Sequence, residues 1–180
     1  MRRLLKRHSD SSCPAATSVE VEISRPDANN LVLRYTLTGN MDDIRIPAVG
    51  PASRSDELWQ HTCFEAFLRA PSGAGYYEFN FSPSTEWAAY RFSGYRDGMA
   101  SAEISAPSIE VQSSPGRFAL LASLGPGQLS DLNRKPSWRL GLSALVEDMS
   151  GQKSYWALTH PPGKPDFHHL DCFAYELSWP

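Results

Sequence analysis

The chain has 180 residues, a length typical of one domain, and 41% of them are hydrophobic, which is enough for a buried core. Its 17 basic and 20 acidic side chains give a net charge of −3, which argues against a nucleic-acid-binding surface. No run of about 18 apolar residues occurs, so the sequence predicts no membrane-spanning helix.

The first 18 residues are basic and poor in apolar side chains. Only Leu4 and Leu5 follow the paired arginines, whereas a secretory signal needs an apolar stretch of about 7–15 residues. The sequence therefore predicts a cytoplasmic protein. We expect residues 1–18 to form a partly ordered extension and residues 19–180 to form a single domain.

Short stretches of alternating polar and apolar residues, separated by turn residues, follow one another along the chain. The predicted strands cover residues 19–23, 31–37, 62–68, 76–81, 87–92, 108–112, 118–123, 138–146, 155–158 and 173–177. No window of about 12 residues has helical periodicity, and single helical turns are expected only at 56–60 and 127–132. About ten short strands at this spacing predict an all-β protein, an antiparallel β-sandwich of the immunoglobulin or jelly-roll kind.

The three strands predicted over residues 62–92 carry a cluster of polar side chains. If they form a meander and turn their more apolar sides to the core, a single group of residues shares the outer face. This group is Glu65, Glu78, Asn80, Trp87 and Arg91. Carboxylates and amides suit sugar hydroxyls, and an indole ring suits the apolar face of a pyranose.

This polar face predicts a sugar site, and an ordinary solvated sheet face with Glu–Arg pairs is the alternative. Candidates for a second aromatic wall are Trp59, Tyr95 and Trp156. Loop residues 160–167 are rich in proline, and stiff loops at the end of a sandwich often position a ligand. His160 and His168 are therefore candidate residues of the rim.

Two neighbouring glutamates are also the residue types of a glycosidase acid and base. Because Arg91 belongs to the same predicted face, we expect Glu65 and Glu78 to be ionised, which leaves no general acid. The sequence therefore predicts no catalytic residue.

The cysteines Cys13, Cys63 and Cys172 are odd in number and form no CxxC pair, which argues against a disulfide framework and a four-cysteine zinc site. A mixed set of His61, Cys63, His168, His169 and Cys172 contains metal-ligating residue types. Adjacent histidines on an extended chain point to opposite sides, so at most one of His168 and His169 serves a given site. We predict no metal site.

Three segments carry a family resemblance. DELWQHTCFEAFL at 56–68, YYEFNFSP at 76–83 and WAAY at 87–90 resemble the core of DOMON-like domains related to family 9 carbohydrate-binding modules. SYWAL at 154–158, HPP at 160–162 and PDFHH at 165–169 are similar to a bacterial stand-alone DOMON-like subgroup. The resemblance covers most of residues 19–178 and implies a β-sandwich that binds a sugar or a haem on one face.

In the sugar-binding branch, the resemblance implies site roles for Trp59, Glu65 and Asn80. The second stacking tryptophan of that branch has only Trp156 and Trp179 as candidates, and its calcium ions have no recognisable acidic loop here. The haem-binding branch holds iron with methionine and histidine. The residues of those types are Met41, His160, His168 and His169.

The sequence thus predicts a non-catalytic module for a carbohydrate or a sugar-containing metabolite, without a cofactor and without a nucleic-acid or membrane partner. The predicted ligand-binding residues are Trp59, Glu65, Glu78, Asn80, Trp87, Arg91, His160 and His168. A haem-binding redox module is one alternative. A protein-interaction domain that buries its tryptophan face in a homodimer is another.

Overall fold

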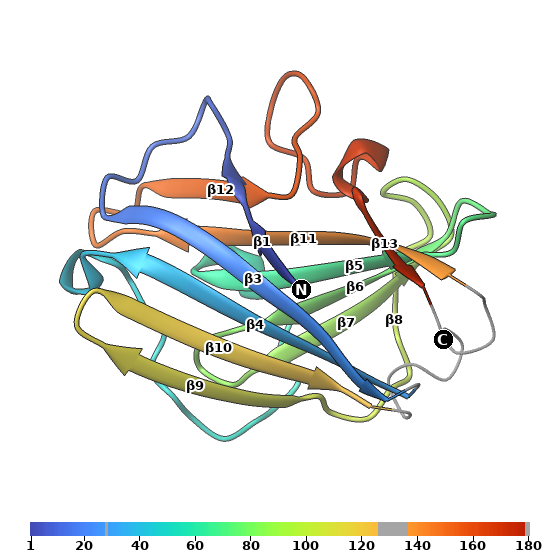
Figure 1. Ribbon diagram of the computed structural model, residues 1–180, viewed down its shortest axis with the longest axis horizontal. Helices are drawn as coiled ribbons and strands as arrows, with labels where there is room; N and C mark the ends of the chain where they lie inside the picture. Colours follow the sequence, from blue (N-terminus) through green and yellow to red (C-terminus); the bar gives the residue numbers. More distant parts are fainter. Residues whose placement is uncertain (28, 126–136, 179–180) are drawn as a thin grey trace.

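The computed structural model describes residues 1–27, 29–125 and 137–178, which form two β-sheets stacked face to face (Figure 1). The smaller sheet has the strand order β1 (Arg2–Leu4), β3 (Ala16–Asp27), β4 (Asn30–Gly39), β10 (Arg117–Leu124) and β9 (Ser108–Ser114). The larger sheet has the order β2 (Lys6–Arg7), β12 (Lys153–Ala157), β11 (Ser137–Glu147), β5 (Cys63–Arg69), β6 (Tyr76–Phe81), β7 (Trp87–Phe92) and β8 (Ala100–Ser101). Strand β13 (Tyr175–Ser178) also pairs with β11.

Every pairing between these strands is antiparallel, which confirms the predicted β-sandwich. All ten predicted strands are present with small shifts of their ends, whereas β1, β2 and β8 have only two or three residues and show no readable alternation. The turn expected at 56–60 is a 3-10 helix, η2 (Leu58–Gln60), and the turn expected at 127–132 lies outside the described residues. In residues 1–27, 29–125 and 137–178, no helix is long and apolar enough to cross a membrane.

The N-terminal segment contributes to both layers. Strand β1 pairs with β3 at the edge of the smaller sheet, and β2 pairs with β12 at the edge of the larger one. Residues 2–4 and 6–7, which we expected in a partly ordered extension before the domain, are therefore strands of the two sheets.

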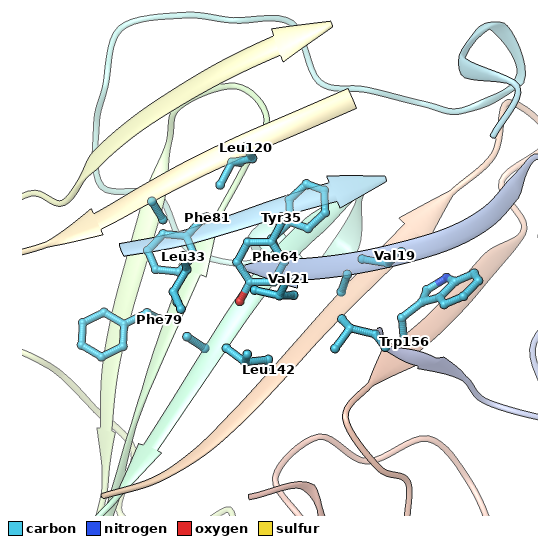
Figure 2. Packing of buried hydrophobic residues seen from close by; sticks show 14 of the residues in the cluster. Val19, Val21, Leu33, Tyr35, Phe64, Phe79, Phe81, Leu120, Leu142 and Trp156 are labelled. Carbon is cyan, nitrogen blue, oxygen red and sulfur yellow. The ribbon is translucent and has the colours of Figure 1, made fainter. Parts of the chain in front are cut away.

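The main core lies between the sheets, where large side chains of both layers meet (Figure 2). It includes Val19, Val21, Leu33, Tyr35, Phe64, Phe79, Phe81, Leu120, Leu142 and Trp156. Burying one such side chain stabilises the fold by about 1.5–3 kcal/mol. The Tyr35 hydroxyl donates a hydrogen bond of 2.7 Å to the backbone carbonyl of Glu65, so the one polar atom of this buried ring has a partner in the opposite sheet.

A second apolar layer covers the outer face of the larger sheet. Its buried members are Phe67, Tyr76, Ala88, Tyr90, Phe92 and Phe173. Phe173 comes from the segment between β12 and β13, which packs over the sheet. The central strands of the larger sheet are therefore buried on both faces.

This double burial corrects the prediction for β7. Strand β6 pairs Phe81 with Trp87 and Glu78 with Tyr90, so Trp87 faces the main core and Tyr90 stands beside the glutamate. Trp87 and Arg91 thus lie on the face opposite to the predicted one, and their place in the polar cluster is wrong. The prediction turned the more apolar side of β7 inward, whereas the outer aromatic layer covers that side.

Candidate functional site

A cavity of about 790 Å³ lies on the outer face of the larger sheet. Glu65 of β5 and Glu78 of β6 line its floor, together with Tyr90 and Phe92 of β7. Three segments surround this floor: residues 56–59 before β5, residues 96–101 after β7, and residues 165–168 between β12 and β13. Regular strands therefore fix the floor, and irregular segments form the walls.

The two glutamates of the floor are neighbours across the β5–β6 pair. Glu65 pairs with Asn80 and Glu78 pairs with Phe67, so the two carboxyl-bearing residues stand diagonally to one another on the same face. Both are buried, with 4% and 6% of their surface exposed. Their side chains accept one hydrogen bond each, Glu65 Oε2 from Ser143 Oγ at 3.0 Å and Glu78 Oε1 from Asn80 Nδ2 at 2.7 Å.

Burial changes the protonation of this pair. Burial, and after it the charge of Glu78, raise the pKa of Glu65 to about 8, against the Ser143 hydrogen bond and the charge of Arg96. The pKa of Glu78 is also raised by burial, while Asn80 and Arg96 oppose the shift. Glu65 is therefore protonated at neutral pH. The prediction that Arg91 keeps both carboxyl groups ionised is wrong, because Arg91 lies on the other face of β7.

His168 stands above Glu78, with its Nε2 atom 3.8 Å from Glu78 Oε2. The backbone N–H of Arg96 donates to the Tyr76 hydroxyl oxygen at 3.2 Å, and that hydroxyl lies 2.8 Å from His168 Nδ1. Burial and the charge of Arg96 lower the pKa of His168 to about 4, against the charge of Asp166. His168 is therefore a neutral imidazole at neutral pH, and its Nδ1 atom shares a hydrogen bond with the Tyr76 hydroxyl.

Asp166 holds the segment between β12 and β13 against the cavity. Its carboxylate accepts hydrogen bonds from Arg96 Nη2 at 2.8 Å, from the Tyr95 hydroxyl, and from the backbone N–H of His168 at 3.1 Å. Burial raises the pKa of Asp166, but the hydrogen bonds from Tyr95 and Arg96 outweigh it and lower that pKa. The ionised Asp166 thus fixes Arg96 and His168 relative to the floor.

Aromatic rings form much of the rim. Trp59 on η2 is 50% exposed, an unusual degree for an indole, and lines the cavity. Tyr155 of β12 and Phe167 pack together on another side, with ring centres 6.1 Å apart. The Tyr90 hydroxyl donates a hydrogen bond of 2.6 Å to Asp56 Oδ1, which connects β7 to the segment that carries Trp59. The rim offers flat apolar faces above a polar floor.

The predicted site residues divide between the cavity and other places. Trp59, Glu65, Glu78 and His168 line the cavity. Asn80 is 1% exposed and lies behind Glu78, which its side-chain amide holds.

Two further candidates, His160 and Trp156, lie outside the cavity. His160 does not line the cavity; its Nε2 atom contacts the Lys6 carbonyl at 2.8 Å and its ring packs edge-on against His8. Trp156, a candidate for the second aromatic wall, is buried in the main core, where its Nε1–H donates to Ser154. Trp179 lies outside the described residues.

Several cavity residues were missed in the sequence: Tyr90, Phe92, Arg96, Tyr155 and Phe167. A usable signal existed for the first two. The turn between β6 and β7 has five residues, and a symmetric hairpin around it pairs Phe81 with Trp87 and places Tyr90 beside Glu78. Arg96 and Phe167 lie in loops, and no local pattern places them at the floor.

The histidines and cysteines form no metal centre in the described part of the chain, where no group of three or more His, Cys, Asp or Glu side chains is arranged to hold an ion. His61 Nδ1 instead lies 2.6 Å from Glu147 Oε2. Cys172 Sγ contacts the carbonyls of Thr159 and Asp166, both at 3.2 Å.

A smaller hollow of about 520 Å³ lies between β3 and β13. The charged side chains on its lining, Arg25, Asp27 and Glu176, are partly or fully exposed. The cavity over Glu65 and Glu78 is therefore the better candidate for a functional site.

Solved structures of other proteins share this architecture. No family model and no curated protein matches the sequence. A protein from Bacteroides uniformis ATCC 8492, described as a candidate carbohydrate-binding protein, has a TM-score of 0.66 and 14% identity, over 99% of this chain and 85% of the other. A family 9 carbohydrate-binding module from Caldicellulosiruptor kristjanssonii in complex with glucose has a TM-score of 0.54 and 12% identity, over 97% and 83%. A family 9 module from the same organism in complex with cellotriose has a TM-score of 0.53 and 13% identity, over 91% of this chain and 74% of the other. At these identities the matches show the fold: an antiparallel β-sandwich shared with family 9 carbohydrate-binding modules.

Proposed function

We propose that the protein is a non-catalytic carbohydrate-binding module that holds a small sugar in the cavity over Glu65 and Glu78. The observation that carries this proposal is the combination of an exposed indole at the rim with two buried carboxyl groups on the floor. Aromatic rings pack on the apolar face of a pyranose, and carboxyl groups both accept and donate hydrogen bonds to its hydroxyls. The neighbouring family 9 modules, which hold glucose and cellotriose, support the same ligand class.

The finer assignment, a DOMON-like domain for a carbohydrate or a sugar-containing metabolite, is part of the same proposal. The motifs DELWQHTCFEAFL and YYEFNFSP support it, because they contain Trp59, Glu65 and Glu78, which line the cavity. Asn80, from the second motif, has the supporting role of orienting Glu78.

The position of the two glutamates argues against hydrolysis, although Glu65 is protonated as a general acid must be. A glycosidase places its two carboxyl groups on either side of the scissile bond. Glu65 and Glu78 project from neighbouring strands on one face of one sheet, so they stand on the same side of a ligand that lies on this face. Incubation with nitrophenyl glycosides is therefore expected to release no nitrophenol, and steady release would contradict the proposal.

A thermal-shift screen against neutral, acidic and amino sugars tests the binding. A ligand at about a hundredfold its Kd stabilises the fold by about 2.7 kcal/mol, which raises the Tm by roughly 5–10 °C for a chain of this size. The Trp59→Ala variant is expected to lose the shift while its own Tm without sugar stays close to that of the wild type, because the indole is half exposed.

Three other results of the screen would be informative. A shift that survives in Trp59→Ala would remove the indole from the site. A flat screen with a coloured protein would favour the haem-binding alternative, and a flat screen with a colourless dimer would favour the interaction domain.

A further inference from the structure

The floor of the cavity lacks a cation. In the described part of the chain, no lysine or arginine nitrogen lies within 4.0 Å of a carboxyl oxygen of Glu65 or Glu78. The other buried glutamate of the larger sheet, Glu147, has an arginine partner, Arg45 Nε at 3.6 Å, and its Oε2 atom lies 2.6 Å from His61 Nδ1. Buried acids are stable as anions only when they are paired and hydrogen-bonded. Glu65 and Glu78 therefore have no lysine or arginine partner among the described residues, whereas Glu147 has an arginine partner.

Nearby nitrogens of the protein do not fill this role. His168 is neutral at neutral pH, as its buried position and low pKa dictate, and its Nε2 is 3.8 Å from Glu78. Arg96 is ion-paired with Asp166 through Nη2 at 2.8 Å. Lys153 lines the cavity from β12 but forms no ion pair with either glutamate. No lysine or arginine of the described residues is therefore ion-paired with the floor glutamates, and a cationic group of a ligand would be the first to pair with them directly.

The two carboxyl groups also have free hydrogen-bonding capacity directed into the cavity. A carboxylate offers about four acceptor sites, and each of these side chains uses one of them, toward Ser143 or Asn80. Glu65 Oε1 has no hydrogen-bond partner among the described residues, although the residue is 4% exposed and lines the cavity. This carboxyl oxygen is open to the cavity, so a hydrogen-bond donor of a ligand can reach it.

The aromatic walls of the cavity suit a ligand that has both a cationic group and a sugar ring. Tyr90 and Phe92 stand on the floor, and Tyr155, Phe167 and Trp59 surround it. The face of an aromatic ring attracts a cation within about 6 Å, and the same face packs on the apolar side of a sugar ring.

We propose that the ligand carries a protonated amino group, as a hexosamine with a free amine does, and that Glu65 and Glu78 together bind this group while the aromatic rim holds the sugar ring. This inference rests on the proposed function and names its ligand class. Glu65 holds a proton in the free protein and gives it to the solvent when the ammonium group binds. The bound state then contains one ammonium group between two carboxylates, and one proton is released for each ligand bound.

The release of a proton gives the binding a characteristic pH dependence. The apparent affinity for the amino sugar rises about tenfold per pH unit between about pH 6 and pH 7, because Glu65 ionises more readily as the pH rises toward its own pKa. A neutral sugar has no such dependence. The titratable and charged groups around the two carboxyl groups and on the cavity lining are Tyr35, Asp56, Glu57, Cys63, Tyr76, Tyr90, Arg96, Lys153, Tyr155 and His168. Within this pH range Glu65 is below its pKa of about 8, and His168 is neutral because its pKa is about 4.

The experiment compares D-glucosamine, D-glucose and N-acetyl-D-glucosamine by titration calorimetry with the whole chain. We expect glucosamine to bind about 10- to 100-fold more tightly than the two neutral sugars, the range for a charge-assisted hydrogen bond. Calorimetry in two buffers of different ionisation enthalpy is expected to show about one proton released per glucosamine bound and none for glucose.

Variants separate the floor from the rest of the site. Glu65→Gln and Glu78→Gln are expected to bring the ratio of glucosamine to glucose affinity close to one. The matched control is Glu110→Gln, the same substitution on an exposed position of β9, which is expected to keep the ratio of the wild type.

Each remaining outcome is decisive. Equal affinity for glucosamine and glucose would overturn the amine inference and leave the proposed function standing. Binding of none of the three sugars would contradict both. A glucosamine preference that persists in Glu65→Gln and in Glu78→Gln would place the amine elsewhere and overturn the inference.

Discussion

Replacing Trp87 with alanine is expected to lower the free energy of unfolding by about 3–5 kcal/mol, the usual cost of removing a large aromatic ring from a core. The indole is 6% exposed, packs between the two sheets, and lies under the guanidinium of Arg54, which is 5.0 Å from the ring centre. For a chain of this length the loss corresponds to a fall in Tm of roughly 6–20 °C. Calorimetry or urea unfolding measures it directly.

The comparison variant is Trp59→Ala, which removes the same ring from a half-exposed position. We expect Trp59→Ala to lose sugar binding with little change in stability, and Trp87→Ala to lose stability first. The opposite pattern, a stable Trp87→Ala protein that no longer binds sugar, would show that β7 presents its other face to the ligand and that the sequence-based assignment of Trp87 was right.

Replacing Glu65 with glutamine is expected to stabilise the protein at alkaline pH by removing a carboxyl group that resists ionisation. Its pKa rises to about 8 in the folded chain, above the ordinary value of 4.5. Between these values the folded state keeps a proton that the unfolded state has lost, so stability falls as the pH rises, by about 1.4 kcal/mol per unit. Between about pH 6.5 and pH 8 the wild type is expected to lose about 2 kcal/mol that Glu65→Gln retains.

The chosen range avoids an opposing contribution from His168. Its pKa falls to about 4 from the ordinary 6.5, so it makes stability rise with pH between these values and offsets Glu65 there. Above pH 6.5 that contribution is complete, and the raised pKa of Glu78 acts in the same direction as Glu65. Urea unfolding of the wild type, Glu65→Gln and the surface control Glu110→Gln across this range isolates the one carboxyl group. Parallel curves for wild type and Glu65→Gln would mean that Glu65 is ionised in the folded protein.

The fold was predictable because its signals are local. Alternation along residues 76–81 and turn residues on either side suffice to identify a strand, and antiparallel neighbours follow from short connections. The face of a strand is a different matter. When both faces of a sheet are covered, as here on β7, Tyr90 and Phe92 are as apolar as the residues that face the core, and composition no longer distinguishes inside from outside.

The part of the site that alternation could predict is the part carried by strands, whereas Trp59 and His168 were found from the family resemblance and from the proline-rich loop. Glu65 and Glu78 were found because two-residue alternation fixes which side chains share a face. Arg96 and Phe167 were not, because their positions depend on contacts between distant loops. The Arg96–Asp166 ion pair joins residues 70 positions apart, and no local pattern specifies such a contact. The protonation of Glu65 was missed for the same reason, since it depends on how completely the outer layer excludes water.

The floor of the cavity belongs to the larger sheet, whereas the wall with Phe167 and His168 belongs to one irregular segment near the end of the chain. A ribosome therefore synthesises the strands of the floor before the residues that close the site, and ligand can be held in full only after the last part of the domain has emerged. The two parts are nevertheless not independent, because residues 158–174 include Phe173, a buried member of the outer apolar layer. Exchanging this segment for a loop of another length would therefore alter the wall of the cavity and the stability of the larger sheet together.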